Sequence, residues 1–310
     1  MTVTSLYLLG QLGVNLFMLI SGYFMIKTEF KWKKVVILIV EVQFYWWITL
    51  FLADLIGVAP LPTGKELFLT FFPIITNRWW FITAYLVIYI LSPFLNLTVR
   101  AMDNQTYRKL LTILLTLYCV IPTFFGFFYN STETLLYYNR LIWLGILYLL
   151  GGYLSRVKTL ENKTAAWMIV GSVLIMVGTI PIINSNSDFF NMLGTQQIAY
   201  FMTPNNIPMI ILSVAIFTIF AHIKMSYSPI INTVASTTLG IYLFSDSFLN
   251  GWLWRDVFRC AEYPNFPDVI LRILGATTIV FLSCVGVDLL RQFLFRGIAK
   301  AWKHFGSLKN

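Results

Sequence analysis

The sequence predicts an all-α, polytopic integral membrane protein, a helical bundle of about nine transmembrane helices. Of the 310 residues, 58% are hydrophobic and only 11% are charged, and the mean hydropathy is +0.75. A soluble domain carries roughly 25% charged residues, so this composition cannot build a water-facing surface. Apolar runs of about 20 residues recur between short polar breaks, which favours helices over the alternating strands of about ten residues in a barrel.

Nine segments are predicted to span the membrane: 5–26, 35–57, 79–99, 110–128, 140–154, 165–183, 207–223, 231–249 and 269–290. The fifth of them is short, but it contains Gly145, Gly151 and Gly152. Small residues let helix backbones approach closely within a membrane. We therefore expect this helix to pack tightly against a neighbour.

The basic residues are distributed unevenly between the two ends of these segments. Of the 22, 16 lie on one side: Lys27, Lys31, Lys33, Lys34, Arg100, Arg108, Lys109, Arg156, Lys158, Lys163, Lys224, Arg291, Arg296, Lys300, Lys303 and Lys309. Six lie on the other: Lys65, Arg78, Arg140, Arg255, Arg259 and Arg272. The positive-inside rule makes the first side cytoplasmic, which predicts a multi-pass protein of the cell membrane with its carboxy terminus in the cytoplasm. Because the basic residues mark helix ends, the net charge of +9 does not indicate a nucleic-acid partner.

The amino terminus is placed outside by the same rule, and no cleavable signal sequence is evident before the first span. Two explanations are open. Either residues 1–11, which are short and uncharged, cross the membrane unaided, or an upstream helix is absent from this chain.

The carboxy-terminal stretch 291–310 is expected to form a cytoplasmic amphipathic tail after a membrane domain that covers residues 1–290. Apolar residues recur there at helical spacing among basic residues: Leu294, Ile298, Trp302 and Phe305. Such a stripe favours a helix anchored on the anionic inner leaflet.

The predicted outer segments are longer than the inner ones. Thr63 and Glu66 have the spacing of a capping box and precede an apolar run, which predicts a helix lying on or dipping into the outer interface. Residues 184–206 and 250–268 form two further outer loops, interpreted either as the roof of an outward cavity or as plain connectors.

Candidate binding residues lie near the outer ends of the spans. Arg78 precedes Trp79 and Trp80; its guanidinium suits a phosphate or pyrophosphate, and the indoles suit stacking on a sugar ring. The alternative is an aromatic-belt anchor with a snorkelling arginine, and the same two interpretations hold for Arg140. Asp246 is expected to pair with one of these arginines or to bind an acceptor hydroxyl, unless it only ends its helix in solvent.

The groups usually used for hydroxyl activation are missing from the outer side. The two histidines, His222 and His304, both fall on the cytoplasmic side, so no outer histidine is available as a general base. Glu41 lies inside the second span and is interpreted first as a structural partner of a neighbouring helix, second as a participant in transfer. The three cysteines, Cys119, Cys260 and Cys284, are scattered, so neither a disulfide framework nor a metal site is expected.

Four stretches of the chain resemble the membrane acyltransferase 3 family, which acetylates sugars of bacterial envelope polysaccharides. Gly13-Val14-Asn15-Leu16-Phe17 followed by Ser21-Gly22-Tyr23-Phe24 is similar to the family's G-V-D-L-F-F and S-G-[FY]. Trp79-Trp80-Phe81 followed by Tyr85 to Pro93 is similar to its W-[FY]-L helix ending in L-x-P. Arg140 with Gly145 and Gly151-Gly152 is similar to R-x-x-x-F-x-x-G, and Ser236-Thr237-Thr238-Leu239-Gly240-Ile241-Tyr242-Leu243 to S-x-x-[TS]-[FL]-G-[IV]-Y-L-I-H.

The resemblance implies a membrane O-acyltransferase that moves an acyl group, acetyl first, from cytoplasmic acyl-CoA to a hydroxyl of a cell-envelope or lipid-linked glycan. No bound cofactor or metal is implied, and the partners are the two substrates and membrane lipid. Residues on the acceptor side would be Arg78, Trp79, Trp80, Arg140, Tyr242 and Asp246. Lys31, Lys33, Lys34 and Arg100 suit the CoA phosphates, although the positive-inside rule alone also places basic residues there.

The chain departs from the family at the residues expected to carry the reaction. Family members have ten spans, and their first helix bears a histidine that assists transfer; this chain lacks that helix and that histidine. Asn15 stands where the family has aspartate, and Phe244-Ser245 where it has Ile-His. Asn15, Ser21, Gly22 and Tyr23 are therefore assigned only as motif residues, and the catalytic residue is unknown. Two alternatives follow: an exporter of a lipid-linked saccharide, and a remnant without catalytic activity.

Overall fold

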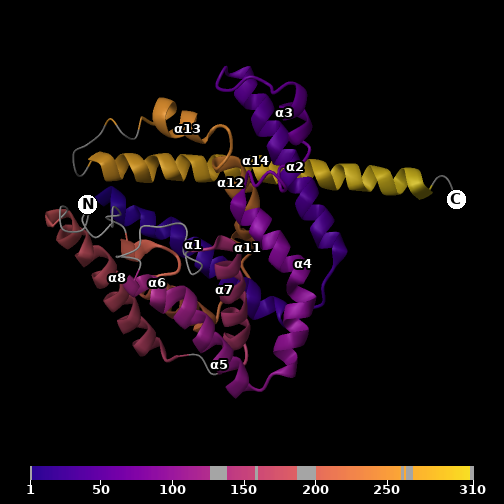
Figure 1. Ribbon diagram of the computed structural model, residues 1–310. Helices are drawn as coiled ribbons and strands as arrows, with labels where there is room; N and C mark the ends of the chain where they lie inside the picture. Colours follow the sequence, from indigo (N-terminus) through magenta and orange to yellow (C-terminus); the bar gives the residue numbers. More distant parts are fainter. Residues whose placement is uncertain are drawn as a thin grey trace. The chain divides into compact units, whose positions relative to one another are not determined.

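The computed structural model describes residues 2–125, 138–157, 160–186, 200–259, 262 and 268–307, with side chains described from Gly10 to Gly297 within these ranges. All of their regular secondary structure is helical (Figure 1), which confirms the predicted all-α class. Six helical stretches are long and apolar enough to cross a membrane: Trp32–Leu55, Trp80–Ala101, Asn104–Phe125, Asn162–Ser185, Tyr200–His222 and Asp268–Gly297. Gly10–Met25 and Arg140–Leu154 are shorter apolar helices. The protein is therefore a polytopic membrane bundle, whereas the count of nine crossings stays a prediction.

The chain forms two compact units, and each is assembled from two separate stretches of sequence. Unit 1 contains Met1–Lys31 and Phe81–Lys224; unit 2 contains Trp32–Trp80 and Met225–Asn310. Segments distant in sequence therefore share a unit.

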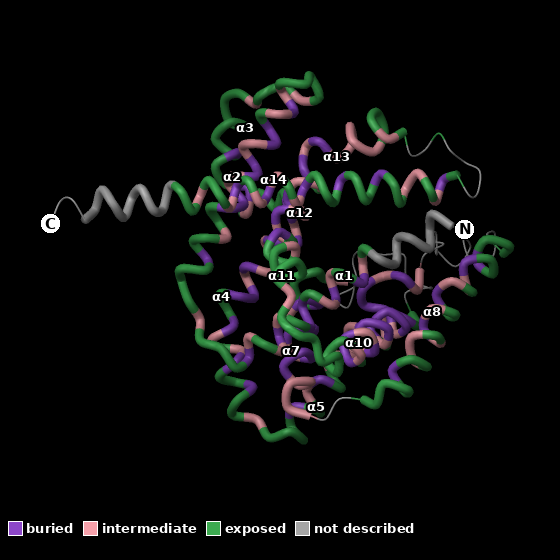
Figure 2. The backbone as a smooth tube through the Cα atoms, turned by 180° about the vertical axis from the view of Figure 1, so that it is seen from behind, coloured by how far each residue is buried: buried purple, intermediate pink, exposed green. Residues whose placement is uncertain are grey.

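Unit 1 is built on the packing of four helices. Its elements are α1 (Thr2–Met25), α4 (Trp80–Ala101, from Phe81 on), α5 (Asn104–Leu115), the π-helical turn η1 (Thr116–Val120), α6 (Ile121–Phe125), α7 (Arg140–Leu154), α8 (Asn162–Ser185), the 3₁₀ turn η2 (Tyr200–Met202) and α10 (Ile207–His222). Helix α1 packs against α7 and α10, and α8 packs against α10. Helix α7 is buried along most of its length (Figure 2).

Glycines explain the close approach of α1 and α7. A Cβ placed on Gly22 would collide with the backbone carbonyl of Tyr148, and one placed on Gly151 would collide with that of Leu19. Each helix thus presents a glycine where the other helix presents backbone. The expectation of tight packing is confirmed for Gly151 and for its neighbour Gly152, which lies against Ile26 and Tyr107. It is wrong for Gly145, where a Cβ would meet nothing within 4 Å.

The carboxy-terminal ends of α1, α4 and α7 lie together at one end of unit 1. The Lys27 ammonium donates to the Ser155 carbonyl at 3.1 Å, and Arg100 donates to the Ile26 carbonyl at 3.0 Å. Arg156 donates to the carbonyls of Val99 and Met102 at 2.8 and 3.1 Å. Basic side chains therefore satisfy the free carbonyls of three helix ends. This agrees with the prediction that the three spans run in the same direction.

Unit 2 contains the longest helix. Its elements are α2 (Trp32–Leu55), α3 (Gly64–Leu69), α11 (Pro229–Ser236), α12 (Thr238–Ser245), α13 (Asn250–Trp252), the π-helical turn η3 (Leu253–Val257) and α14 (Asp268–Ser307). Helix α12 packs against both α14 and α2. The loop after α3 is tied to α2, because the Gln43 amide donates to the Thr70 carbonyl at 3.0 Å and the Trp47 ring contacts the Phe71 ring.

Two expectations for unit 2 need correction. The predicted span 231–249 is not one helix, because the turn residue Thr237 separates α11 from α12. The predicted capping box is wrong, because the Thr63 side chain makes no capping bond and Gly64 has a positive φ of 56°. The helix of the last predicted span continues into the predicted tail, since α14 extends to Ser307 without a break.

The prediction that Arg291 belongs to the cytoplasmic tail is wrong for its side chain. Its side chain is not part of a solvated tail but is buried and ion-paired. Of the predicted tail stripe, Leu294 is exposed, whereas the side chains of Ile298, Trp302 and Phe305 lie outside the described ones. Anchoring on the inner leaflet and the boundary between residues 290 and 291 stay predictions.

The two predicted outer loops are described only in part. Most of 184–206 falls outside the described residues, but its last part packs within unit 1, where Asn205 donates to the Tyr118 carbonyl at 3.1 Å. In 250–268, α13 and η3 form two short helical turns. Cys119 and Cys284 are buried packing residues as expected, and Cys260 lies outside the described residues.

Candidate functional site

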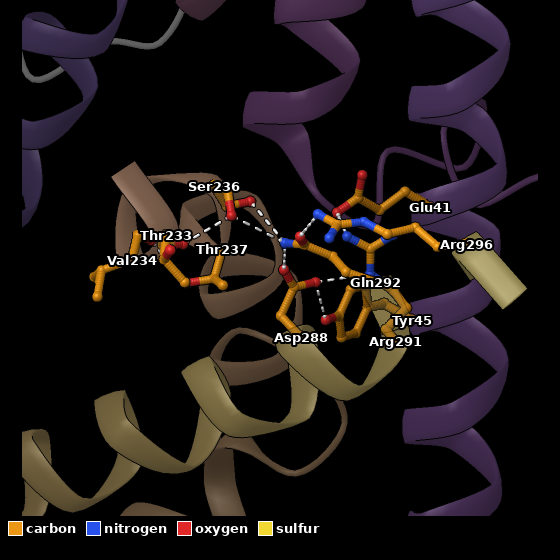
Figure 3. Close-up of polar contacts among 10 residues, drawn as sticks. All are labelled: Glu41, Tyr45, Thr233, Val234, Ser236, Thr237, Asp288, Arg291, Gln292 and Arg296. Atoms are coloured by element: carbon orange, nitrogen blue, oxygen red, sulfur yellow. Dashed lines mark hydrogen bonds and ion pairs between the residues drawn. The ribbon is translucent and has the colours of Figure 1, made fainter. Parts of the chain in front are cut away.

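A cluster of buried polar and charged side chains lies inside unit 2, between α2 and α14 (Figure 3). Asp288 is at its centre and is completely buried. One of its carboxylate oxygens accepts hydrogen bonds from the Tyr45 hydroxyl and the Arg291 Nε, both at 2.7 Å. The other accepts from the Gln292 amide at 2.7 Å. Hydrogen bonds of this length to a carboxylate are strong, so both oxygens of Asp288 are held in place by their partners.

Arg291 connects this aspartate to a second carboxylate. Its guanidinium bonds to Glu41 of α2 at 2.8 Å while its Nε bonds to Asp288. The side chains of Arg291 and Glu41 are only 9% and 12% exposed. The rings of Phe295 and Tyr45 flank the guanidinium, with centroids at 5.3 and 5.8 Å. A charged cluster at membrane depth is costly unless it is paired, and such clusters mark functional sites by default.

The break between α11 and α12 lies beside the same cluster. The Gln292 amide donates to the carbonyl and to the hydroxyl of Ser236, both at 3.2 Å. One turn into α12, a Cβ on Gly240 would lie 2.5 Å from the Tyr45 hydroxyl oxygen and closer still to the Asp288 carboxylate. Glycine is therefore required at position 240 if α12 is to approach the cluster so closely.

A second polar centre in unit 2 surrounds Arg78. Its guanidinium lies over the Phe248 ring at 4.5 Å and near the Trp46 ring at 5.8 Å. The preceding residue, Asn77, has a φ of 55°, a conformation that asparagine tolerates better than most residues and that directs the chain into α4. The Trp79 indole packs against Trp46 at 5.6 Å and donates to the backbone carbonyl of Asp246 at 2.9 Å.

Trp46 leaves a polar atom unsatisfied at this second centre. Its side chain is 93% buried, since its exposed fraction is 7%, yet its indole nitrogen has no hydrogen-bond partner. A buried donor without an acceptor costs about 1–3 kcal/mol. The Arg78 centre therefore contains a buried donor that forms no hydrogen bond within the described part of the chain.

The two centres lie at different levels of the same two helices. On α2, Trp46 is five residues beyond Glu41, a rise of about 7.5 Å. On α12, Asp246 follows Gly240 by six residues, a rise of about 9 Å. Unit 2 therefore holds an acid–base cluster at one level and an exposed arginine among aromatic rings about one and a half turns further on.

The structure brings together some of the residues predicted from the sequence. Arg78, Trp79 and Asp246 meet in unit 2, and Tyr242 lies one turn before Asp246 on the same face of α12. Asp246 faces the charge of Arg78, although the two form no close ion pair in the described part of the chain; its carboxylate accepts a bond from the Asn250 amide at 3.4 Å. The backbone carbonyl, rather than the carboxylate, holds Trp79.

Arg140 belongs to unit 1, where it begins α7 after the capping residue Asn139. Trp80 begins α4 and is the last residue of the first stretch of unit 2. Of the residues proposed for CoA phosphates, Arg100 is engaged with the end of α1, whereas Lys31, Lys33 and Lys34 are exposed.

The motif residues of α1 are structural. Asn15 is completely buried; its amide donates to the Pro204 carbonyl at 2.9 Å and to the Ser213 hydroxyl at 3.2 Å, and its oxygen accepts from the Trp143 indole at 3.1 Å. One side chain thus ties α1 to α7 and α10. Gly22 admits α7, and Tyr23 contacts the Phe217 ring and the Lys27 ammonium, while Ser21 is half-buried.

Sequence reasoning missed three members of the charged cluster: Tyr45, Asp288 and Arg291. Glu41 was correctly expected to bind a neighbouring helix. Asp288 did carry a usable signal, because it is an acidic residue inside an apolar run with an arginine three positions later. Trp46, the unsatisfied donor, carried no such signal, since aromatic residues are common in spans.

Taken together, the helical spans and the buried charged cluster define a multi-pass integral membrane protein with a polar site inside its apolar helices. A family model described as an acyltransferase domain matches residues 1–291. The chain therefore belongs to the membrane acyltransferase 3 family and is a membrane acyltransferase. No curated protein and no solved structure gives a significant match to it.

Proposed function

We propose that this protein transfers an acyl group, acetyl in the first instance, from acyl-CoA to a hydroxyl of a cell-envelope or lipid-linked glycan. The observation that carries the proposal is the family match, which extends over residues 1–291. The reaction forms a bond between the hydroxyl oxygen and the acyl carbon and breaks the bond from that carbon to the CoA sulfur.

The Arg78 centre supports an oxygen-rich acceptor. The guanidinium of this exposed residue lies over aromatic rings, an arrangement that leaves its N–H edge available for a phosphate or a sugar hydroxyl. The Trp46 ring lies beside the same guanidinium, with its centroid at 5.8 Å. We assign Arg78, Trp46 and Trp79 to acceptor binding, together with Asp246 and Tyr242 on α12.

The test uses membranes from cells that express the full chain, given acetyl-CoA labelled in its acetyl group. Label in the glycan fraction that depends on the chain supports the proposal, and its absence with every glycan and lipid-linked acceptor tried refutes it. The variant Arg78→Lys keeps the charge but loses the planar fork, so we expect a transfer rate lower by about tenfold or more. Arg255→Ala is the control, because Arg255 is an exposed arginine of the same unit whose bond in the described part of the chain is to the nearby Gly251 carbonyl.

A further inference from the structure

The charged cluster of unit 2 contains two carboxylates, those of Glu41 and Asp288, but one basic group, the guanidinium of Arg291. The titratable or charged groups that face Glu41 are Tyr45 of its own helix and Asp288 and Arg291 of α14. Helices α11 and α12 present Ser236 and Gly240, respectively, to the cluster, and neither helix contains a charged residue. Arg296, the next basic residue of α14, is exposed and bonds to Gln292 at 3.3 Å.

Of the two carboxylates, Glu41 is the one with fewer hydrogen-bond partners in the described part of the chain. Asp288 is completely buried and accepts three hydrogen bonds, so both of its carboxylate oxygens already have partners. It therefore forms a lasting pair with Arg291. Glu41 receives one bond, from Arg291 to a single carboxylate oxygen. The other oxygen of Glu41 has no partner in the described part of the chain, and 12% of this side chain remains exposed.

We propose that Glu41 is the proton acceptor of the acyl transfer, in the role that a histidine would otherwise fill. This inference rests on the proposed function. The acceptor hydroxyl gives its proton to the free carboxylate oxygen of Glu41 while its own oxygen attacks the acyl carbon. The CoA sulfur leaves as a thiolate and takes the proton back from Glu41, so the cluster ends each cycle unchanged.

In this scheme the neighbours of Glu41 are positioning residues. Arg291 fixes one carboxylate oxygen and leaves the other free, and Asp288 with Tyr45 fixes Arg291. Asp288 also neutralises the guanidinium, which lets Glu41 change charge without leaving an arginine unpaired. A carboxylate with one free oxygen beside a neutral pair suits reversible protonation.

The first experiment measures protonation of Glu41 without any substrate. Infrared difference spectra of the full chain in lipid nanodiscs are recorded between two pH values, following the carbonyl stretch of protonated carboxylic acids. We expect a pH-dependent band that disappears in Glu41→Gln and persists in Glu66→Gln, a control in which an exposed acid of α3 is replaced. A spectrum that Glu41→Gln leaves unchanged overturns the proposal.

The second experiment measures acyl transfer by the same variants. Removing a general base typically lowers the rate by about 10²–10⁴-fold, so Glu41→Gln is expected in that range and Glu66→Gln near the wild type. Glu41→Asp should restore part of the rate and shift its pH profile, which loss of a merely structural bond would not do. Full activity in Glu41→Gln overturns the proposal. An infrared band with no transfer by the wild type instead leaves the proton site standing and refutes the proposed function, so the two failures are distinct.

Discussion

Replacing Arg291 by methionine removes the cation shared by Glu41 and Asp288 while retaining most of the buried side-chain volume. Breaking a buried ion pair by removing one partner costs about 3–5 kcal/mol, because the remaining charge is left uncompensated. Both carboxylates lose the same partner, so the two losses are coupled and do not simply add. We therefore expect a loss of about 3–5 kcal/mol in the free energy of unfolding and a fall in Tm on the order of 10 °C.

The assay is thermal unfolding in detergent, followed by tryptophan fluorescence at one fixed scan rate, because membrane proteins often unfold irreversibly. Arg296→Met is the matched control, since Arg296 lies on the same helix but is exposed and makes one long bond. Equal Tm values for the two variants at neutral pH would refute the reasoning.

A triple variant tests whether charge, rather than packing, sets the loss. Combining Arg291→Met with Glu41→Gln and Asp288→Asn removes every formal charge from the cluster. Replacing a buried ionic group by neutral residues of similar size is often close to neutral in stability. The triple variant should therefore recover much of the Tm lost in Arg291→Met alone, and no recovery would point to lost packing instead.

Three further predictions concern unit 1. Gly151→Val should lower the free energy of unfolding by about 1–3 kcal/mol or more, because the valine side chain meets the backbone of α1. Gly145→Ala should leave the free energy of unfolding unchanged or raise it slightly, since a Cβ there meets open space. The Tm values of the two variants check this. Asn15→Leu leaves the buried Trp143 indole N–H without an acceptor and should lower the free energy of unfolding by about 1–3 kcal/mol. The same assay measures this, and a Tm equal to that of the wild type would contradict it. The Thr106 hydrogen bonds to Asp103 lower the pKa of that carboxyl below its usual value. The stabilisation of the start of α5 by this cap is therefore present above the usual carboxyl pKa and is lost as the pH falls through the lowered pKa. The protection of the first α5 amides, measured as their exchange rate relative to the intrinsic rate at each pH, should decrease in that pH range. Asp103→Asn should abolish this pH dependence of the protection.

Much of the fold could be predicted from local sequence. Long apolar runs with basic ends determine where helices form, because an unpaired backbone group in lipid is too costly to tolerate. Eight of the nine predicted spans accordingly correspond to helical stretches of the structure. The exception is 231–249, where Thr237 interrupts the helix beside Gln292 of α14, a contact that no local pattern encodes. Glycines were equally ambiguous: Gly145 and Gly151 look alike in sequence, and only the path of α1 distinguishes them.

The sequence by itself determined the class of protein, the helical spans and the outer arginine with its tryptophans, because these depend on composition and on neighbours along the chain. Only the tertiary structure decided which charges are buried together. Glu41 and Arg291 are 250 positions apart, and the energy that makes Arg291 part of a site rather than of a solvated tail comes from desolvation and pairing across two helices. That energy depends on the distance between the two side chains in the folded protein, which cannot be calculated from their positions in the sequence.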